Sequence, residues 1–481
     1  MNGMTDTTRR EVLGWLAGLG AAAGMGLLAP GRASASVGVT ALRGVTLVDS
    51  SRVYPNATIV LADDKILAVG SHDLPLPRGS TVLDLPGKFV IPGLWDMHVH
   101  GAFLHRITLP LCLVNGVTGI REMWGFPPLY ELRARIERGE VFGPRLVVGS
   151  SIIDGPHSTL PGALIVATPD EGRQAVRDAK TQGADFVKVY SYLDRPTLAA
   201  IADECARQDI TFAGHCSNHV ALGDASSLGQ KTFEHMYGLP LATSSRETEL
   251  RQRIADLPLD PADPFAWFKQ VLEFEREAAS SHSRGKAVQL ARLLRRNGSA
   301  LCPTMVAMRV YASPADRFEN DPRMKYMPAF YRDLWRDGLK RWVPVTPQEI
   351  RQQAEFFRRR ADQVAEMHEL GVEVLVGTDA GNPYVFSGFS VHDELELLVE
   401  AGLSPHAALK AGTRGTRLTP GGEADLVVLD GNPLKDIRNT QRIHAVLTRG
   451  RVLGSAERQQ MLADVEKAAQ EPIGAVQAQC C

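Results

Sequence analysis

The hydrophobic and polar positions of this chain follow two patterns, one toward the two ends and one in the middle. Toward each end, short apolar runs are separated by turn residues, a pattern typical of β-strands in small antiparallel sheets. These runs cover residues 42–48, 58–61, 65–69, 81–84, 424–429 and 445–448. Because they flank a much longer middle segment, we predict that the two chain ends build one small β-sandwich together.

The middle of the chain alternates between strands and helices. Candidate strands cover residues 90–100, 119–123, 145–153, 186–190, 211–216, 232–236, 300–306 and 373–380. Amphipathic stretches lie between them, for example at 169–182, 196–207, 348–370 and 392–398. Eight strands alternating with helices in one domain predict an α/β fold, a (β/α)8 TIM barrel. A doubly wound open sheet is the alternative, but no glycine-rich dinucleotide fingerprint follows the first strand.

This pattern divides the chain into parts. The sandwich takes residues 36–89 and 414–455, the barrel takes 90–413, and a C-terminal helix or tail takes 456–481. Residues 240–298 are charged and helical in composition, so we expect a helical insertion there. Residues 311–345 carry several aromatic side chains among many charges, and they form either a lid over the substrate or a small core of their own.

The N-terminal segment predicts export. Arg9 and Arg10 precede a moderately apolar stretch at 12–30, and a small-residue cleavage site ends at Ala35. This order resembles a twin-arginine signal peptide over residues 1–35. A membrane anchor is the alternative, but the stretch is short and only weakly hydrophobic. We therefore expect a periplasmic or secreted protein that uses the twin-arginine export machinery.

The composition argues against nucleic acid as a partner and against a framework of disulfide bonds. With 481 residues, 44% hydrophobic and 22% charged, the chain is an ordinary globular mixture. A net charge of −2 gives no reason to expect nucleic acid as a partner. The six cysteines do not suggest a disulfide framework in a chain of this size. Four of them lie in apolar segments, where we expect core residues: Cys112, Cys205, Cys216 and Cys302. The other two, Cys480 and Cys481, end a polar tail.

Chemistry-bearing residues stand where the predicted barrel strands end. His98 and His100 close the first strand, and residues two apart in a strand point the same way, so the pair offers half of a metal site. The fourth strand holds Lys188, the fifth and sixth end in histidine and the eighth ends in aspartate: His215, His235 and Asp379. A TIM barrel carries its active site at these strand ends.

Each of these residues has an ordinary explanation when taken alone. A histidine at a strand end is often a hydrogen-bonded core residue, and Asp379 could cap a following turn. Lys188 is harder to explain, because its neighbours are apolar and lysine is almost never fully buried unless it is paired. Six such residues at five strand ends together predict a metal centre.

These segments carry a family resemblance. Residues 91–100, 115–123, 183–190, 234–235, 377–381 and 422–429 are similar to motifs of the amidohydrolase superfamily. The chain resembles its imidazolonepropionase-like metal-dependent hydrolases over nearly all of residues 37–451. The resemblance implies that His98 and His100 bind one metal ion with Asp379, that His215 and His235 bind a second, and that a carbamate on Lys188 bridges the two.

Physical chemistry agrees with that arrangement. A buried neutral lysine is nucleophilic, and its carbamate supplies an anion between two divalent cations. Paired metals ~3.5–4 Å apart generate hydroxide at neutral pH and polarise a carbonyl. Asp379 can accept the proton from that water and return it to the leaving amine. Histidine and carboxylate ligands suit zinc first, with iron or manganese as alternatives.

We therefore expect a metal-dependent hydrolase that cleaves a C–N amide bond of a small peptide-like or N-acyl substrate. Hydrolysis of a lactone or cyclic amide on the same site is an alternative. A deaminase with one metal is another, although Lys188 argues against it. A non-catalytic binding protein on a retained barrel is the alternative from outside the enzymes. Members of this family often form homo-oligomers, so a homo-oligomer is a further alternative for this chain.

Further residues have weaker signals. Four side chains could hold the substrate, although a structural role is the stronger expectation for each: Tyr190, Tyr237, His157 and His392. Glu122 stands where related chains often carry aspartate. Residues 408–413 run almost directly into Arg414 without the helical stretch that relatives place there. This short connection puts the packing of the last barrel helix in question.

Overall fold

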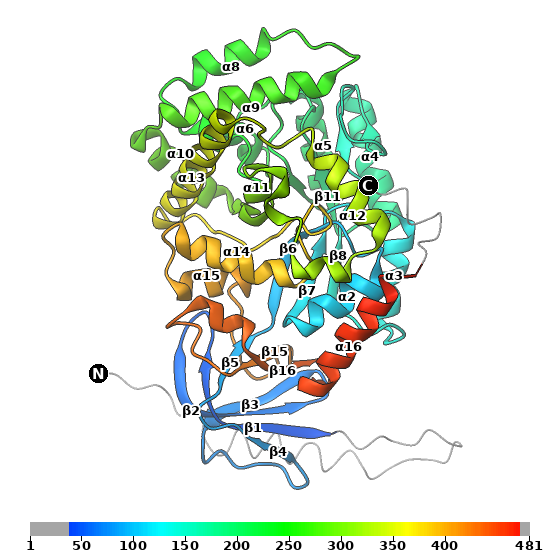
Figure 1. Ribbon diagram of the computed structural model, residues 1–481, viewed down its shortest axis with the longest axis vertical. Helices are drawn as coiled ribbons and strands as arrows, with labels where there is room; N and C mark the ends of the chain where they lie inside the picture. Colours follow the sequence, from blue (N-terminus) through cyan, green and yellow to red (C-terminus); the bar gives the residue numbers. More distant parts are fainter. Residues whose placement is uncertain (1–37, 472–481) are drawn as a thin grey trace.

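The computed structural model describes residues 38–471. The predicted signal peptide at 1–35, the end of the predicted tail, and Cys480 and Cys481 lie outside the described residues. Within 38–471, no helix is long and apolar enough to cross a membrane. Figure 1 shows the strands of both chain ends gathered at one end of the molecule, with a larger helix-rich part beyond them.

The two chain ends share one sheet, as the sequence predicted. Its eight strands lie in the order β17-β16-β15-β5-β1-β2-β3, and β4 pairs with β1. Their bounds are β1 (Val39–Val48), β2 (Val53–Ala62), β3 (Lys65–Ser71), β4 (Thr81–Asp84), β5 (Phe89–Pro92), β15 (Leu426–Leu429), β16 (Ile443–Thr448) and β17 (Arg451–Leu453). The two ends meet where β15 pairs antiparallel with β5, which also lies parallel to β1.

The first predicted strand, at 90–100, is wrong as a single strand. It divides at Gly93 into β5, in the terminal sheet, and β6 (Leu94–Val99), which pairs with β7 (Val117–Glu122). A Cβ atom at Gly93 would lie 1.9 Å from Thr118 Oγ1, so only glycine fits at the division. The chain thus passes directly from the terminal sheet into the strand that carries His98.

The remaining strands pair in parallel. One group is β6-β7-β8, with β8 at Arg145–Val148. The other runs β10-β9-β11-β12-β13-β14. Its members are β9 (Ile153–Asp154), β10 (Leu164–Ile165), β11 (Phe186–Val189), β12 (Thr211–Gly214), β13 (Thr232–Glu234) and β14 (Ala300–Cys302). Isolated parallel bridges extend these groups, joining Gly149 to Phe186, Leu301 to Val374, and Val99 to Ala380. Parallel strands with helical connections confirm the predicted α/β class.

Three predicted strands differ in detail. The segment 145–153 is two short strands, β8 and β9, and 373–380 is held only by isolated bridges. The segment 300–306 ends as a strand at Cys302, and α11 (Met305–Tyr311) follows. The sequence predicts a strand at Met305 and Val306 because both residues are apolar. In the structure they begin helix α11, and their N–H groups donate to Glu394 at 2.9 and 2.7 Å.

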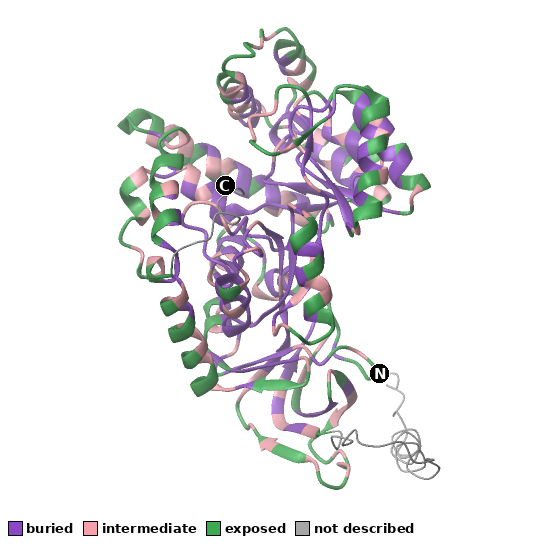
Figure 2. Cartoon of the chain, turned by 90° about the vertical axis from the view of Figure 1, so that its right-hand side faces the viewer, coloured by how far each residue is buried: buried purple, intermediate pink, exposed green. Residues whose placement is uncertain are grey.

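Helices surround the parallel strands (Figures 1 and 2), and their buried sides face inward. They include α2 (His105–Val114), α3 (Pro127–Glu137), α4 (Pro169–Gln182), α5 (Arg195–Arg207), α6 (Leu222–Ser227), α13 (Pro347–Glu369), α14 (Phe389–Glu400), α15 (Pro405–Gly412) and α16 (Ser455–Ala468). Sequence signals set several starts: Thr168 and Glu171 form a capping box before α4, and Thr346 and Glu349 form another before α13.

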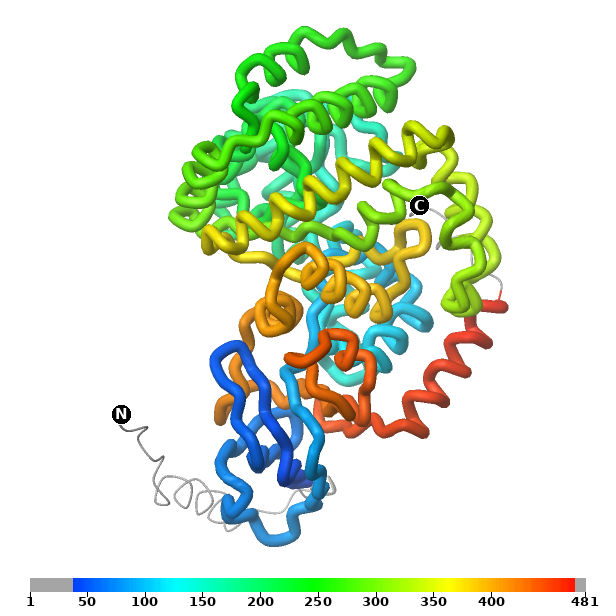
Figure 3. Tube along the Cα trace, turned by 60° about the vertical axis from the view of Figure 1, so that its left-hand side comes forward, coloured from blue at the N-terminus to red at the C-terminus, as the bar shows by residue number. Residues whose placement is uncertain are grey.

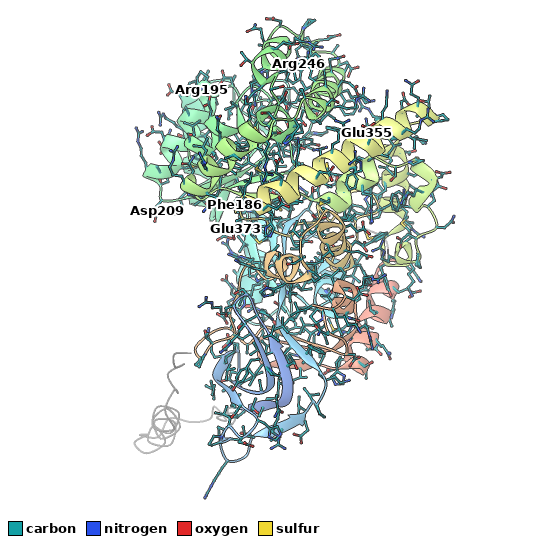
Figure 4. All side chains as sticks on the ribbon, turned by 90° about the vertical axis from the view of Figure 1, so that its left-hand side faces the viewer. Phe186, Arg195, Asp209, Arg246, Glu355 and Glu373 are labelled. Carbon is teal, nitrogen blue, oxygen red and sulfur yellow. The ribbon has the colours of Figure 1, made fainter. Side chains whose placement is uncertain are left out.

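Residues 240–298 are helical, as predicted. They hold most of α7 (Leu239–Ala242), and all of α8 (Glu247–Ala255), α9 (Pro264–Ser280) and α10 (Arg284–Asn297). In the tube of Figure 3 this green segment lies at the opposite end of the molecule from the terminal sheet. Figure 4 places Arg246, just before α8, at the outer end of this region and Glu355 on α13.

The aromatic segment at 311–345 packs inward. It forms two 3-10 turns and α12 (Ala329–Leu339). Trp335 is buried, and its Nε1 donates to Gly381 O at 3.0 Å, while its ring contacts Tyr384 and Phe386. Trp342 packs on Phe265 and Phe268 of the helical insertion. These contacts support the core interpretation of the segment over the lid.

Candidate metal centre

The ends of two parallel segments, β6 and residues 373–380, bring His98, His100 and Asp379 to one point. The Nε2 atoms of His98 and His100 lie 3.1 Å apart, and Asp379 Oδ1 lies 3.4 and 3.3 Å from them. Asp379 Oδ2 lies 3.7 Å from His235 Nδ1. The ligand atoms of His98, His235 and Asp379 all fall within 4.8 Å of one another. Nitrogen and carboxylate atoms facing one point are the arrangement that a divalent metal requires.

His215 and Lys188 complete the group that the sequence predicted. The ring centroid of His235 lies 4.7 Å from that of His215 and 4.5 Å from that of His98. Lys188 is fully buried, and its Nζ has no hydrogen-bond partner among residues 38–471. Burial lowers the pKa of Lys188 to about 8. A buried amine without a hydrogen-bond partner costs free energy. A bound metal ion or other ligand that interacts with the nitrogen would remove that cost.

Three histidines are oriented by a hydrogen bond at Nδ1. His98 Nδ1 lies 2.8 Å from Glu234 Oε2, His215 Nδ1 lies 2.8 Å from Ser191 Oγ, and His235 Nδ1 lies 2.7 Å from Thr304 Oγ1. Burial lowers the pKa of His98 and His215 well below the usual value, and that of His235 to about 4. Neutral imidazoles whose orientation is fixed through one nitrogen are the form that binds metal ions.

Sequence reasoning missed these orienting groups. Ser191 and Thr304 lie in loops and leave no signal. Glu234 could have been found, because a carboxylate inside an apolar strand needs a buried partner. Its partner is Arg121, whose Nη2 lies 3.0 Å from Glu234 Oε1 and whose Nε donates to Met97 O at 2.6 Å. Burial alone would raise the pKa of Glu234, but the charge of Arg121 and the bond to His98 hold it well below its usual range.

The backbone at the centre is unusual. His235, Met236, Thr304 and Asp379 all have positive φ, at 61°, 63°, 46° and 66°. Such conformations are costly for residues other than glycine and collect at functional sites. Asp96 stabilises the backbone beside Asp379, because its carboxylate accepts the N–H groups of Thr378 at 2.9 Å and of His98 at 3.2 Å. This contact sets the spacing between His98 and Asp379.

The weaker candidates separate into two pairs. The Tyr190 ring stacks on His215 with centroids 3.8 Å apart, and the Tyr237 ring lies 5.1 Å from His215. His392 lies away from the cluster: its ring nitrogens contact Thr440 Oγ1 at 3.0 Å and Asn115 O at 3.1 Å. His157 is exposed between β9 and β10. The contacts of His392 support its structural interpretation.

Both departures noted in the sequence have a place in the structure. Glu122 is buried, accepts the N–H groups of Ala102 at 2.9 Å and Trp124 at 3.2 Å, and lies 3.7 Å from His100 Nδ1. After α15, Arg414 lies over the Trp95 ring at 4.3 Å. The short connection is therefore packed against β6. The four described cysteines are free and buried, as predicted.

A family model described as the amidohydrolase family matches residues 89–453, which is most of the chain. The chain belongs to the amidohydrolase family. It is 33% identical to the L-hydantoinase of Paenarthrobacter aurescens over 184 residues, and 26% identical to the ochratoxinase of Aspergillus niger over 257 residues. These matches cover 36% and 40% of this chain, and only 39% and 53% of the two relatives.

Among solved structures, this amidohydrolase is similar to the bottromycin amidohydrolase, with a TM-score of 0.70 and 25% identity. That likeness covers 90% of both chains.

Proposed function

We propose that this chain hydrolyses a C–N amide bond in a small peptide-like or N-acyl substrate at a binuclear metal centre. One observation carries the proposal: Lys188 is fully buried within electrostatic reach of His98, His215, His235 and Asp379, and its Nζ lacks a hydrogen-bond partner among the described residues. A structural lysine would be paired there. An amine that becomes a metal ligand explains the arrangement.

The donor set fits two divalent ions. His98, His100 and Asp379 would hold one, His215 and His235 would hold the other, and Lys188 would bridge them. Neutral imidazoles and carboxylates favour zinc, with iron or manganese next. A bound divalent ion makes water acidic and polarises a carbonyl oxygen, which supplies the nucleophile for amide cleavage.

Lys188 supplies its bridge as a carbamate. With its pKa lowered to about 8 by burial, a sizeable share of the amine is neutral near pH 7–8. The neutral nitrogen attacks the carbon of CO₂. As the C–N bond forms, one C=O π bond gives its electron pair to oxygen, and the nitrogen then loses one of its protons to solvent. The product carries the negative charge that two neighbouring cations need between them.

Asp379 moves the proton of the reaction. Its carboxylate lies 3.3 to 3.4 Å from the histidine nitrogens that face the centre, so it can accept a proton from attacking water. The same carboxyl group can return that proton to the amine that leaves. Tyr190 and Tyr237, whose ring centroids lie 3.8 and 5.1 Å from that of His215, would hold the carbonyl or carboxylate of the substrate.

The finer architecture is part of this proposal. The pairings β6-β7-β8 and β11-β12-β13-β14, together with the bridges at Phe186, Val374 and Ala380, support a closed (β/α)8 barrel with residues 373–380 as its last strand. The eight-stranded terminal sheet and its apolar core support the sandwich. We also propose export by the twin-arginine pathway, with cleavage after Ala35, to the periplasm or exterior.

Metal content per chain tests the function first. The full chain is purified with bicarbonate present, and its metal is measured by elemental analysis. We expect close to two ions per chain, and hydrolysis of some members of a panel of dipeptides and N-acyl amino acids. One ion per chain would favour a mononuclear deaminase. Folded protein that takes up no zinc contradicts the proposal.

A further inference from the structure

The loop that carries His235 has the most unusual backbone of the metal centre. His235, Met236 and Gly238 have φ values of 61°, 63° and 78°, and only glycine adopts this region without steric cost. Strand β13 ends at Glu234, immediately before the loop. A backbone of this kind persists only where neighbouring groups hold it. Those neighbours come from helices far away in the sequence.

Arg360, on α13, holds the first residue of the loop. Its side chain is buried, and its Nη2 donates to the carbonyl oxygen of His235. The guanidinium also lies 5.5 Å from the centre of the Tyr237 ring. One side chain therefore contacts the backbone of a proposed metal ligand and the face of the aromatic residue beside it.

Glu275, on α9, holds the last residue of the loop. It is 1% exposed, and its Oε1 accepts the N–H of Gly238. Burial raises the pKa of Glu275, and the positive charge of Arg360 opposes that rise. The two side chains carry opposite charges, and each makes one hydrogen bond to the backbone at one end of the loop. Two buried residues from different helices thus hold the loop from His235 to Gly238.

We propose that Arg360 and Glu275 are positioning residues that clamp the loop from His235 to Gly238, so that the His235 ring meets the second metal ion. Buried charged residues are by themselves weak support for stability, because apolar residues can fill such a space equally well. The hydrogen bonds of Arg360 and Glu275 instead reach the backbone of the loop that carries His235. The clamp rests on the proposed function, since it takes His235 as a ligand.

The test compares Arg360→Met, Arg360→Lys and Glu275→Met with a control on the same helix as Arg360. Gln363→Leu is that control: Gln363 is buried on α13, and its Nε2 donates to Thr243 Oγ1 at 3.1 Å, away from the loop. Zinc per chain and the zinc dissociation constants are measured by chelator competition without substrate. The visible spectrum of the cobalt-loaded full chain reports the ligand geometry directly.

We expect Arg360→Met to bind one zinc ion as the wild type does, and the second about tenfold more weakly or worse. Arg360→Lys recovers part of the loss, because an ammonium can donate to the carbonyl but lacks the planar fork. The cobalt spectrum changes in Arg360→Met, while Gln363→Leu keeps the wild-type spectrum and affinity.

Two results overturn the clamp: variants that bind two ions with wild-type affinity, or a control that loses affinity to the same degree. If Arg360→Met does not fold, Glu275→Met decides by the same measurements, since methionine has an unbranched side chain of similar length but lacks the oxygen that accepts the N–H of Gly238. A wild type that binds no zinc contradicts the proposed function itself, and with it the clamp. A wild type with two ions and unaffected variants contradicts the clamp alone.

Discussion

Glu234 Oε2 lies 2.8 Å from His98 Nδ1, and both side chains are fully buried. A negative carboxylate at this distance keeps the ring proton on Nδ1, so the lone pair of Nε2 faces the other ligands. Arg121 holds Glu234 from the opposite side. The orientation of His98, the first proposed metal ligand, therefore depends on Glu234 and Arg121.

Replacing Glu234 by glutamine tests this orientation. An amide can present its NH₂ group to Nδ1, which favours the wrong tautomer, so we expect a 10–100-fold loss of zinc affinity. Chelator competition measures it. Glu394→Gln is the control, because Glu394 is buried but accepts the N–H groups of Met305 and Val306 instead of contacting a histidine. Equal affinity in Glu234→Gln and the wild type would contradict the role of Glu234.

Replacing Lys188 by alanine removes the proposed bridge. We expect zinc per chain to fall from about two to about one, with loss of hydrolysis, as measured by elemental analysis and the substrate panel. A small carboxylate such as acetate can enter the space left by the side chain, so added acetate should restore part of the second ion. Unchanged metal content and activity in Lys188→Ala would rule out the carbamate.

Asp49→Asn tests how the short connection after α15 is tied to the terminal sheet. Asp49 Oδ2 accepts Leu418 N at 3.1 Å, and Oδ1 accepts Ser51 N at 2.8 Å. An amide NH₂ cannot accept the bond from Leu418. We expect the free energy of unfolding at pH 7 to fall by about 1–3 kcal/mol, which is the range for a hydrogen bond to a charged group. Urea titration measures the change.

The stability difference between the wild type and Asp49→Asn should decrease as the pH falls. Burial opposes ionisation of Asp49, but the hydrogen bonds from Ser51 and Leu418 outweigh it and leave its pKa below the usual 3.8. The stabilisation is therefore complete above about pH 4 and is lost as the pH falls through the lowered pKa. The gap between wild type and Asp49→Asn should narrow in acid. Asp84→Asn, which breaks an exposed ion pair with Arg43, should change stability little at any pH.

Gly93→Ala tests the division between β5 and β6. The added Cβ would lie 1.9 Å from Thr118 Oγ1 and 2.8 Å from its Cγ2, so we expect a loss of about 1–3 kcal/mol in the free energy of unfolding. Thr118→Ala in the same chain should recover part of it. Gly338→Ala is the control, because no atom lies within 4 Å of its added Cβ. A Gly93→Ala chain as stable as this control would contradict the close packing.

The cluster of proposed ligands could be predicted because its histidines and Asp379 stand at or near the ends of apolar runs, and the topology of parallel strands brings such ends together. Two of the groups that orient the histidines, Ser191 and Thr304, were not predictable, because they become partners only through distances in space. The division at Gly93 was missed because both halves of the run are apolar. Met305 and Val306 were misread for a related reason: burial makes a short helix and a strand look alike.

The pairing of β5 with β15 has a consequence for the order of events in folding. Strand β5 leads directly into the segment of His98 and His100, and one of its two neighbours comes from residues 426–429. The ribosome makes β15 long after β5, so the partner of that strand is missing until synthesis is nearly complete. A truncated chain lacks it altogether. In the proposed metal centre, the strand that leads to His98 and His100 would therefore gain both its neighbours only after the last part of the chain is made. Loading with metal would then be a check that the whole protein has been made.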